Sequence, residues 1–177
     1  MSEELKKTET MADDGKVKTF NVVFNVEGKA VGKMRNEIKG QMVSPVVDEV
    51  FEMATDEGAA HGGDMTAPPP LAYFCTGFVA CLMTQIRAFA KRLRVEVGEV
   101  TVKAHIEWEA RVEGRDPYTS RPVAFRLDID LDSAAPFEDQ KRLLDAAQKG
   151  CFVEATLADP IPVQHKLLID GEYRDAD

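Results

Sequence analysis

The longest apolar stretch of the chain is residues 68–94, PPPLAYFCTGFVACLMTQIRAFAKRLR, and the predicted fold is built around it. Its large apolar side chains recur every three or four residues, at Leu71, Phe74, Phe78, Leu82, Ile86, Phe89 and Leu93. This is the period of a helix with a buried face. Prolines at its start and cations at its end suit the two ends of a helix. The stretch therefore predicts a long central helix, and this helix carries the cysteines Cys75 and Cys81.

Composition narrows the class of protein. The chain has 177 residues, 44% of them hydrophobic, which is enough for one globular domain with a core of its own. A net charge of −9 argues against nucleic acid and against an anionic membrane surface as partners. The apolar run over residues 71–83 is shorter than the roughly 20 residues that span a bilayer. Three cysteines and no expected signal peptide favour a reducing compartment, so we expect a cytoplasmic protein.

Before the long helix, the pattern predicts two strands and a loop. A strand over residues 20–26 is followed by a tight turn at residues 27–29 and a second strand over residues 30–42, which residues 44–45 end. Residues 48–67 mix acidic residues, glycine and alanine without a sustained period. We expect a loop there, with one helical turn at most.

After the long helix, two segments alternate strictly between apolar and polar side chains. They cover residues 99–112 and 123–131 and predict a hairpin with one face in water. A second helix is expected over residues 136–150, ending at a glycine, and a last strand over residues 161–169. The order of elements is typical of an α+β fold. We expect one domain over residues 17–170, with polar tails at residues 1–16 and 171–177.

The three cysteines are the candidates for chemistry. Cys75 and Cys81 are separated by roughly 9 Å along a helix axis, whereas a disulfide tolerates about 7 Å between Cα atoms. These two therefore cannot pair, and Cys151 remains a possible partner for either of them. Cys151 follows a helix C-terminus, which disfavours a thiolate, so it suits a resolving role better than an attacking one. The alternative is that all three are small buried apolar residues.

Other common kinds of site lack support in the sequence. The histidines His61, His105 and His165 share no metal-ligand spacing with each other or with the cysteines. No GxSxG motif occurs, and the glycines after His61 open no phosphate-binding loop. We therefore expect neither a metal nor a cofactor.

Residues 62–92, GGDMTAPPPLAYFCTGFVACLMTQIRAFAKR, resemble the central helix of the OsmC/Ohr family of osmotically induced and organic-hydroperoxide-resistance proteins. In that family a helical cysteine follows the loop proline by eleven residues, as Cys81 follows Pro70. A second family signature, a helix that ends at a cysteine followed by Pro-Val, is matched by residues 151–153. The resemblance covers about residues 17–170. It implies an OsmC-like fold of order β-β-(β)-α-β-β-α-β, with a long central helix packed on antiparallel sheets in an intertwined homodimer.

The resemblance also implies a thiol-dependent peroxidase that acts in oxidative stress defence. Carried over by position, Cys81 attacks an organic hydroperoxide, Cys151 resolves the sulfenic acid, and an external dithiol of the lipoyl type recycles the disulfide. Family members supply an arginine that favours the thiolate, and Arg35 is the candidate here because no other arginine precedes the long helix. Lys29 or Lys33 could take its place.

The chain departs from the family pattern at three points. Family members carry a glutamate after the proline that holds the arginine, whereas this chain has Leu71 and Ala72 there, and Asp64 is the nearest carboxylate before the helix. Phe152 stands where the family has proline, and Cys75 is an additional thiol. The missing glutamate favours the alternatives of a purely structural member or a non-catalytic OsmC-like binding module for an acyl or aromatic ligand, whereas the retained pair of Cys81 and Cys151 favours the peroxidase.

Overall fold

The computed structural model describes residues 17–176, and the predicted tail over residues 1–16 lies outside them. The described chain forms two compact units, one ending at Pro70 and the other beginning at Leu71. The structure is α+β, with antiparallel sheets and one long helix, which confirms the predicted fold class.

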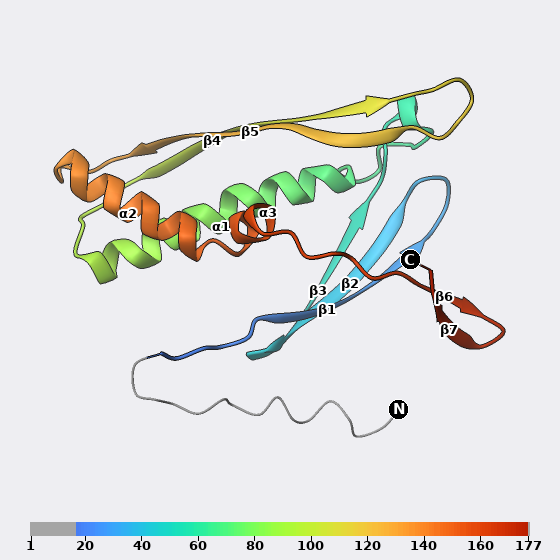
Figure 1. The fold of residues 1–177 in the computed structure, drawn as a ribbon, viewed down its shortest axis with the longest axis horizontal. Helices are drawn as coiled ribbons and strands as arrows, with labels where there is room; N and C mark the ends of the chain where they lie inside the picture. Colours follow the sequence, from blue (N-terminus) through green and yellow to red (C-terminus); the bar gives the residue numbers. More distant parts are fainter. Residues whose placement is uncertain (1–16, 177) are drawn as a thin grey trace. The chain divides into compact units, whose positions relative to one another are not determined.

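The first unit is a three-stranded antiparallel sheet followed by a short helical turn. The strands β1 (Val23–Ala30), β2 (Asn36–Ser44) and β3 (Val46–Thr55) pair in the order β1-β2-β3 (Figure 1). A 3-10 turn, η1 (Ala59–His61), lies in the loop that leads to Pro70. The sheet is a simple meander, in which strands that are consecutive in sequence also pair.

Two predictions for this unit are wrong. Residues 27–29 belong to β1, and the first turn lies further on, where the Val31 N–H donates to the Arg35 carbonyl at 2.8 Å. The segment predicted as a loop from residue 48 instead continues β3. Its apolar and acidic side chains are distributed over both faces, which hides the period of a strand. The strand is fixed by pairing with β2, where the Phe51 ring lies over Gly40 and occupies the space that a side chain would need.

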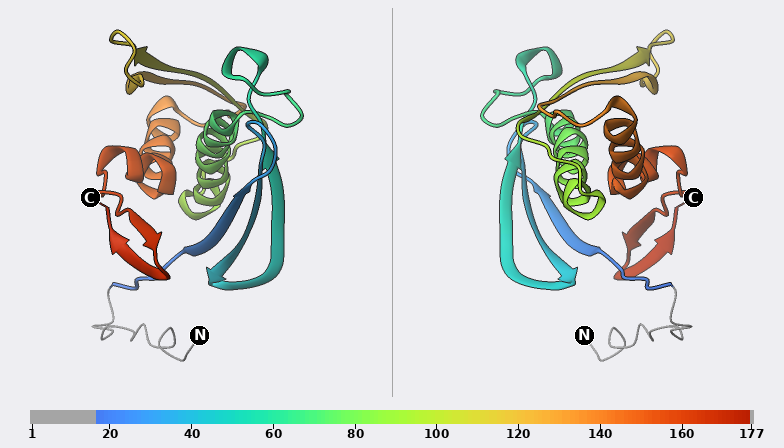
Figure 2. Two further views of the ribbon diagram at one scale, coloured as in Figure 1. Left: turned by 90° about the vertical axis from the view of Figure 1, so that its right-hand side faces the viewer. Right: turned by 90° about the vertical axis from the view of Figure 1, so that its left-hand side faces the viewer.

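The second unit begins with the long helix and a long hairpin. Helix α1 (Pro70–Leu93) follows the predicted bounds closely. Strands β4 (Val100–Arg111) and β5 (Thr119–Leu131) form an antiparallel pair, as their alternation predicts. Helix α2 (Phe137–Gly150) then runs beside α1 (Figures 1 and 2).

The C-terminal part of this unit differs from the prediction. A further helix, α3 (Phe152–Ala158), starts directly after Cys151. Of the strand expected over residues 161–169, only β6 (Lys166–Ile169) forms, and it pairs with β7 (Glu172–Asp175) where a polar tail was expected. The two strands are joined by Asp170 and Gly171, both with positive φ, which is the geometry of a tight hairpin turn.

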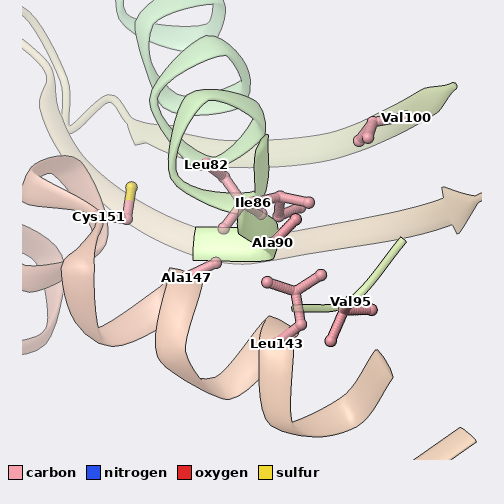
Figure 3. Close-up of a cluster of buried hydrophobic side chains, with 8 residues drawn as sticks. All are labelled: Leu82, Ile86, Ala90, Val95, Val100, Leu143, Ala147 and Cys151. Atoms are coloured by element: carbon pink, nitrogen blue, oxygen red, sulfur yellow. The ribbon is translucent and has the colours of Figure 1, made fainter. Parts of the chain in front are cut away.

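The core of the second unit lies between α1, α2 and the β4–β5 hairpin. Its buried residues, drawn in Figure 3, are Leu82, Ile86, Ala90, Val95, Val100, Leu143, Ala147 and Cys151. The helices approach closely at Gly150, where a methyl group would meet the Phe89 ring at 2.5 Å. Gly150 therefore allows α1 and α2 to pack closely, in addition to ending α2.

Helix α1 as a whole is long and apolar enough to cross a membrane by length and composition alone. The shorter apolar run over residues 71–83 predicted the opposite, because that run is too short for a span. The core helix of a globular protein meets the same test. In the described chain 17% of the apolar window of α1 is buried, and Leu82 and Ile86 are fully buried against side chains of the same unit.

Candidate thiol site

The structure brings Cys81 and Cys151 together. Cys81 is half-buried on α1, beside Leu82, and packs against the core cluster. Cys151 is fully buried between α2 and α3 and belongs to that cluster, close to Leu82 and Ala147 (Figure 3). Cys81 is close enough to Cys151 to contribute to the rise in the pKa of the Cys151 thiol, and both side chains belong to the same packed region between α1 and α2. Both thiols are free.

The environment of Cys151 keeps its thiol protonated. Burial is the largest cause, and together with the nearby Cys81 thiol it raises the pKa of Cys151 to about 11. The backbone amides of Glu154 and Val153 act in the opposite direction, although no capping hydrogen bond of standard geometry forms at this helix start. Cys151 is thus a thiol, rather than a thiolate, at neutral pH.

The protonated state of Cys151 agrees with the sequence-based expectation, but its physical cause is different. The expectation rested on the C-terminus of α2, whose dipole disfavours a thiolate. Cys151 also stands at the N-terminus of α3, where a dipole has the reverse effect. Removal from water, and not the end of a helix, therefore decides the protonation of Cys151.

Cys75 lies in a different environment on the same helix. It is half-buried and lines an open apolar pocket of about 360 Å³ with Thr76, Val79, Ala80 and Met83. It is a free thiol, and Cys81 is the helical cysteine that packs against the cluster containing Cys151. The structure therefore distinguishes the two helical cysteines by their neighbours.

Arg35 belongs to the first unit, at the start of β2. Its guanidinium donates to the Thr66 hydroxyl at 3.0 Å and to the Thr66 carbonyl at 3.5 Å, and Nε lies 3.9 Å from a Glu37 carboxylate oxygen. The Thr66 hydroxyl in turn donates to Asp56 Oδ2 at 2.7 Å. A chain of hydrogen bonds thus runs from Arg35 through Thr66 to Asp56.

Asp56 anchors this chain. Its side chain is 2% exposed and also accepts from the backbone N–H groups of Thr66 and Glu57, each at 2.9 Å. The hydrogen bonds from Thr66 are the main cause that lowers the pKa of Asp56. The candidate carboxylate Asp64 instead pairs with Lys33 at 2.8 Å. Asp56 and Thr66 were not predicted from the sequence, because Asp56 becomes buried only when the loop between these two residues folds.

The histidines are not part of a metal centre in the described chain. Across residues 17–176, no group of three His, Cys, Asp or Glu side chains is placed to hold a metal ion. His61 lies 3.8 Å from Glu57, and His105 lies 3.7 Å from Glu107, both at exposed positions.

Comparisons with known proteins support an OsmC-like fold. Residues 61–166 match the family model described as OsmC-like protein. The crystal structure of an OsmC-like hydroperoxide resistance protein from Jannaschia sp. CCS1 is 47% identical, covers 88% of this chain and 98% of its own, and has a TM-score of 0.60.

Two more distant structures share the fold alone. One is an organic hydroperoxide resistance protein OsmC from Legionella pneumophila, 13% identical, which covers 80% of this chain and 91% of its own with a TM-score of 0.53. The other is an OsmC-like protein from Mycoplasma pneumoniae, 15% identical, with coverage of 81% and 89% and a TM-score of 0.52. No curated protein matches this chain.

Proposed function

The chain belongs to the OsmC-like protein family, and on that premise we propose that it reduces organic hydroperoxides with the cysteine pair Cys81 and Cys151. The 47% identical protein from Jannaschia is described as a hydroperoxide resistance protein, which supports a peroxide-related role. The single observation that carries the finer proposal is that Cys81 packs against the buried cluster that contains Cys151.

In the first step the Cys81 thiolate attacks the distal oxygen of the hydroperoxide. A sulfur–oxygen bond forms, the oxygen–oxygen bond breaks, and the departing alkoxide takes a proton to leave as an alcohol. The product on the protein is a sulfenic acid at Cys81. Cys81 suits this step because it is half-exposed, whereas Cys151 is completely buried.

In the second step Cys151 attacks the sulfenic sulfur of Cys81. The sulfur–sulfur bond forms, the sulfenic hydroxyl leaves as water, and the proton of the Cys151 thiol completes that water. The packing of Cys81 against the cluster that contains Cys151 supports this step, because the two side chains lie in the same region between α1 and α2. An external dithiol of the lipoyl type then reduces the disulfide and returns both thiols.

A nearby cation stabilises an attacking thiolate, and the family resemblance implies Arg35 for that role. The support within its own unit is the hydrogen bond to Thr66, which Asp56 holds from the buried side. This arrangement offers Arg35 an anchor in place of the glutamate that the chain lacks. We further propose that the protein works as a homodimer in the cytoplasm.

A thiol titration tests the proposal directly. The reduced protein has three titratable cysteines, and one equivalent of cumene hydroperoxide is expected to leave one, Cys75. Three thiols that still titrate after peroxide would contradict the peroxidase and favour the non-catalytic binding module. A control with hydrogen peroxide at the same concentration shows whether the organic group matters.

A further inference from the structure

An open groove lies beside the C-terminal part of α1, within the unit that begins at Leu71. It has a volume of about 800 Å³ and is lined by residues of α1 and of the segment that leads to β4. Its charged lining residues are the cations Arg87, Lys91 and Arg94 and the carboxylate Glu96. The lining therefore carries an excess of positive charge, although the whole chain has a net charge of −9.

The three cations of this groove are exposed and have no ion-pair partner. Elsewhere on the same unit a cation such as Lys149 pairs with a carboxylate, that of Asp145, at 2.7 Å. No carboxylate of the described residues pairs with Arg87, Lys91 or Arg94. Arg87 and Lys91 are four residues apart on one helix, and like charges at that spacing repel each other. The stretch thus holds uncompensated positive charge that a bound anion would neutralise.

The helix dipole explains only part of this arrangement. It favours cations in the last turn of a helix and falls off within that turn. Lys91 lies in the last turn of α1, whereas Arg87 precedes the helix end at Leu93 by six residues. Arg94 has a φ of 55°, a left-handed conformation that costs free energy in residues other than glycine. An arginine thus occupies a position that glycine would fill at a lower cost, so the gain from its side chain lies elsewhere.

We propose that this groove binds a small polyanion, a molecule that carries two or more phosphate or carboxylate groups. Arg87 and Arg94 supply planar guanidinium groups, which bind either kind of oxyanion through paired N–H donors, and Lys91 adds a third charge. The Cα atoms of Arg87 and Lys91 are about 6 Å apart along the helix axis, which suits two linked anionic groups better than one. The site is independent of the proposed peroxidase activity, because none of the cysteines lines the groove.

Three probes identify the anion. Pyrophosphate carries two phosphate groups, citrate carries three carboxylates, and inorganic phosphate is the single-group reference. Each is titrated into the reduced full-length protein at pH 7 and at a constant low ionic strength, and calorimetry gives the dissociation constant. We expect saturable binding of pyrophosphate or citrate, tighter than that of phosphate, and the tighter of the two identifies the chemical class. Added NaCl is expected to weaken this binding, because salt screens exposed charges.

Variants of the groove test whether the binding belongs to it. Arg87→Gln is expected to weaken the tighter polyanion about tenfold, the value of one hydrogen bond between charged groups. Arg94→Gly is expected to weaken it similarly while the thermal midpoint of the free protein stays the same or rises, because glycine suits the left-handed conformation. A loss of affinity in Arg94→Gly is therefore not a loss of fold. Glu96→Gln removes the negative charge of the lining and is expected to strengthen binding.

A matched control removes a cation outside the groove. Arg115→Gln changes the net charge by the same amount at an exposed position in the loop between β4 and β5, and it is expected to leave the affinity unchanged. Absence of saturable binding, polyanions that bind no more tightly than phosphate, or equal losses in Arg115→Gln and Arg87→Gln would each overturn the proposal.

Discussion

Cys81 on α1 packs against the buried cluster that contains Cys151, at the junction of α2 and α3. Their proximity results from the packing of α1 on α2, which places Leu82 and Ala147 in the same buried cluster. Cys81 is half-buried and Cys151 is fully buried. The two helices thus place a partly accessible thiol near a thiol that is removed from solvent.

The first prediction distinguishes the two cysteines of α1. Cys81→Ser is expected to abolish consumption of cumene hydroperoxide with a dithiol reductant, while Cys75→Ser retains most of the activity. The reason is that Cys81, and not Cys75, packs against the buried cluster that contains Cys151. The rate of peroxide loss under excess dithiol measures both variants. Equal losses would contradict the choice of Cys81 as the nucleophile.

The elements with a clean period could be predicted from the sequence. Helix α1 and the hairpin of β4 and β5 each place apolar side chains on one face, and their bounds agree closely with the expected ones. Strand β3 has no such face, and its position follows from pairing with β2. The turn at Asp170 and Gly171 has a recognisable sequence signal, because an Asp-Gly pair is typical of a two-residue hairpin turn.

The candidate site was less predictable for a physical reason. Spacing alone left Cys151 open to either helical cysteine, and the choice of Cys81 came from the family resemblance. The burial of Cys151 and Asp56 depends on how helices and loops pack, which the local sequence pattern does not encode. The chemistry of each group depends on that burial, so protonation states followed only from the structure.

The second prediction concerns stability at high pH. The pKa of Cys151 rises from its ordinary value of 9.0 to about 11 on folding. Below pH 9 both states hold the proton, and between pH 9 and 11 the unfolded chain loses it while the folded protein does not. The free energy of unfolding is therefore expected to fall as the pH rises through this window. Cys151→Ser removes this part of the fall, and Cys75→Ser, the control, retains it; denaturant unfolding at several pH values measures both.

The third prediction concerns Asp56. Hydrogen bonds from Thr66 lower its pKa, so its contribution to stability is present above the ordinary value of 3.8 and is lost as the pH falls through the lower folded value. Asp56→Asn is expected to unfold at a lower denaturant concentration than the wild type at pH 7, and the difference is expected to shrink below pH 4.

A matched variant checks that this effect belongs to the buried network. Asp64→Asn removes an exposed ion pair with Lys33, whose net contribution is small. Denaturant unfolding of both variants at pH 7 and pH 3 makes the comparison. If Asp64→Asn destabilised the protein as much as Asp56→Asn, the anchoring role of Asp56 would be wrong.

The fourth prediction concerns assembly. Leu71 on α1 is 55% exposed and Phe74 is 36% exposed in the described chain. Apolar side chains at such exposure on one long helix are typical of a surface covered by another chain. Multi-angle light scattering is expected to give about twice the chain mass of 19.6 kDa. A stable species at the mass of one chain would remove the homodimer from the proposal.

The last prediction follows the oxidised protein. If Cys151 resolves a sulfenic acid on Cys81, peroxide treatment gives one intrachain disulfide between them and leaves Cys75 free, which peptide mass mapping detects. In Cys151→Ser the first turnover still occurs, because attack on the peroxide needs only Cys81. The sulfenic acid then has no partner within reach, so a second equivalent of peroxide drives Cys81 to the sulfinic state, which a dithiol does not reverse. The intact mass of Cys151→Ser is therefore expected to rise by two oxygen atoms, while the wild type under the same treatment loses two hydrogens. A bond between Cys75 and Cys151 would instead place the nucleophile one and a half turns earlier on α1.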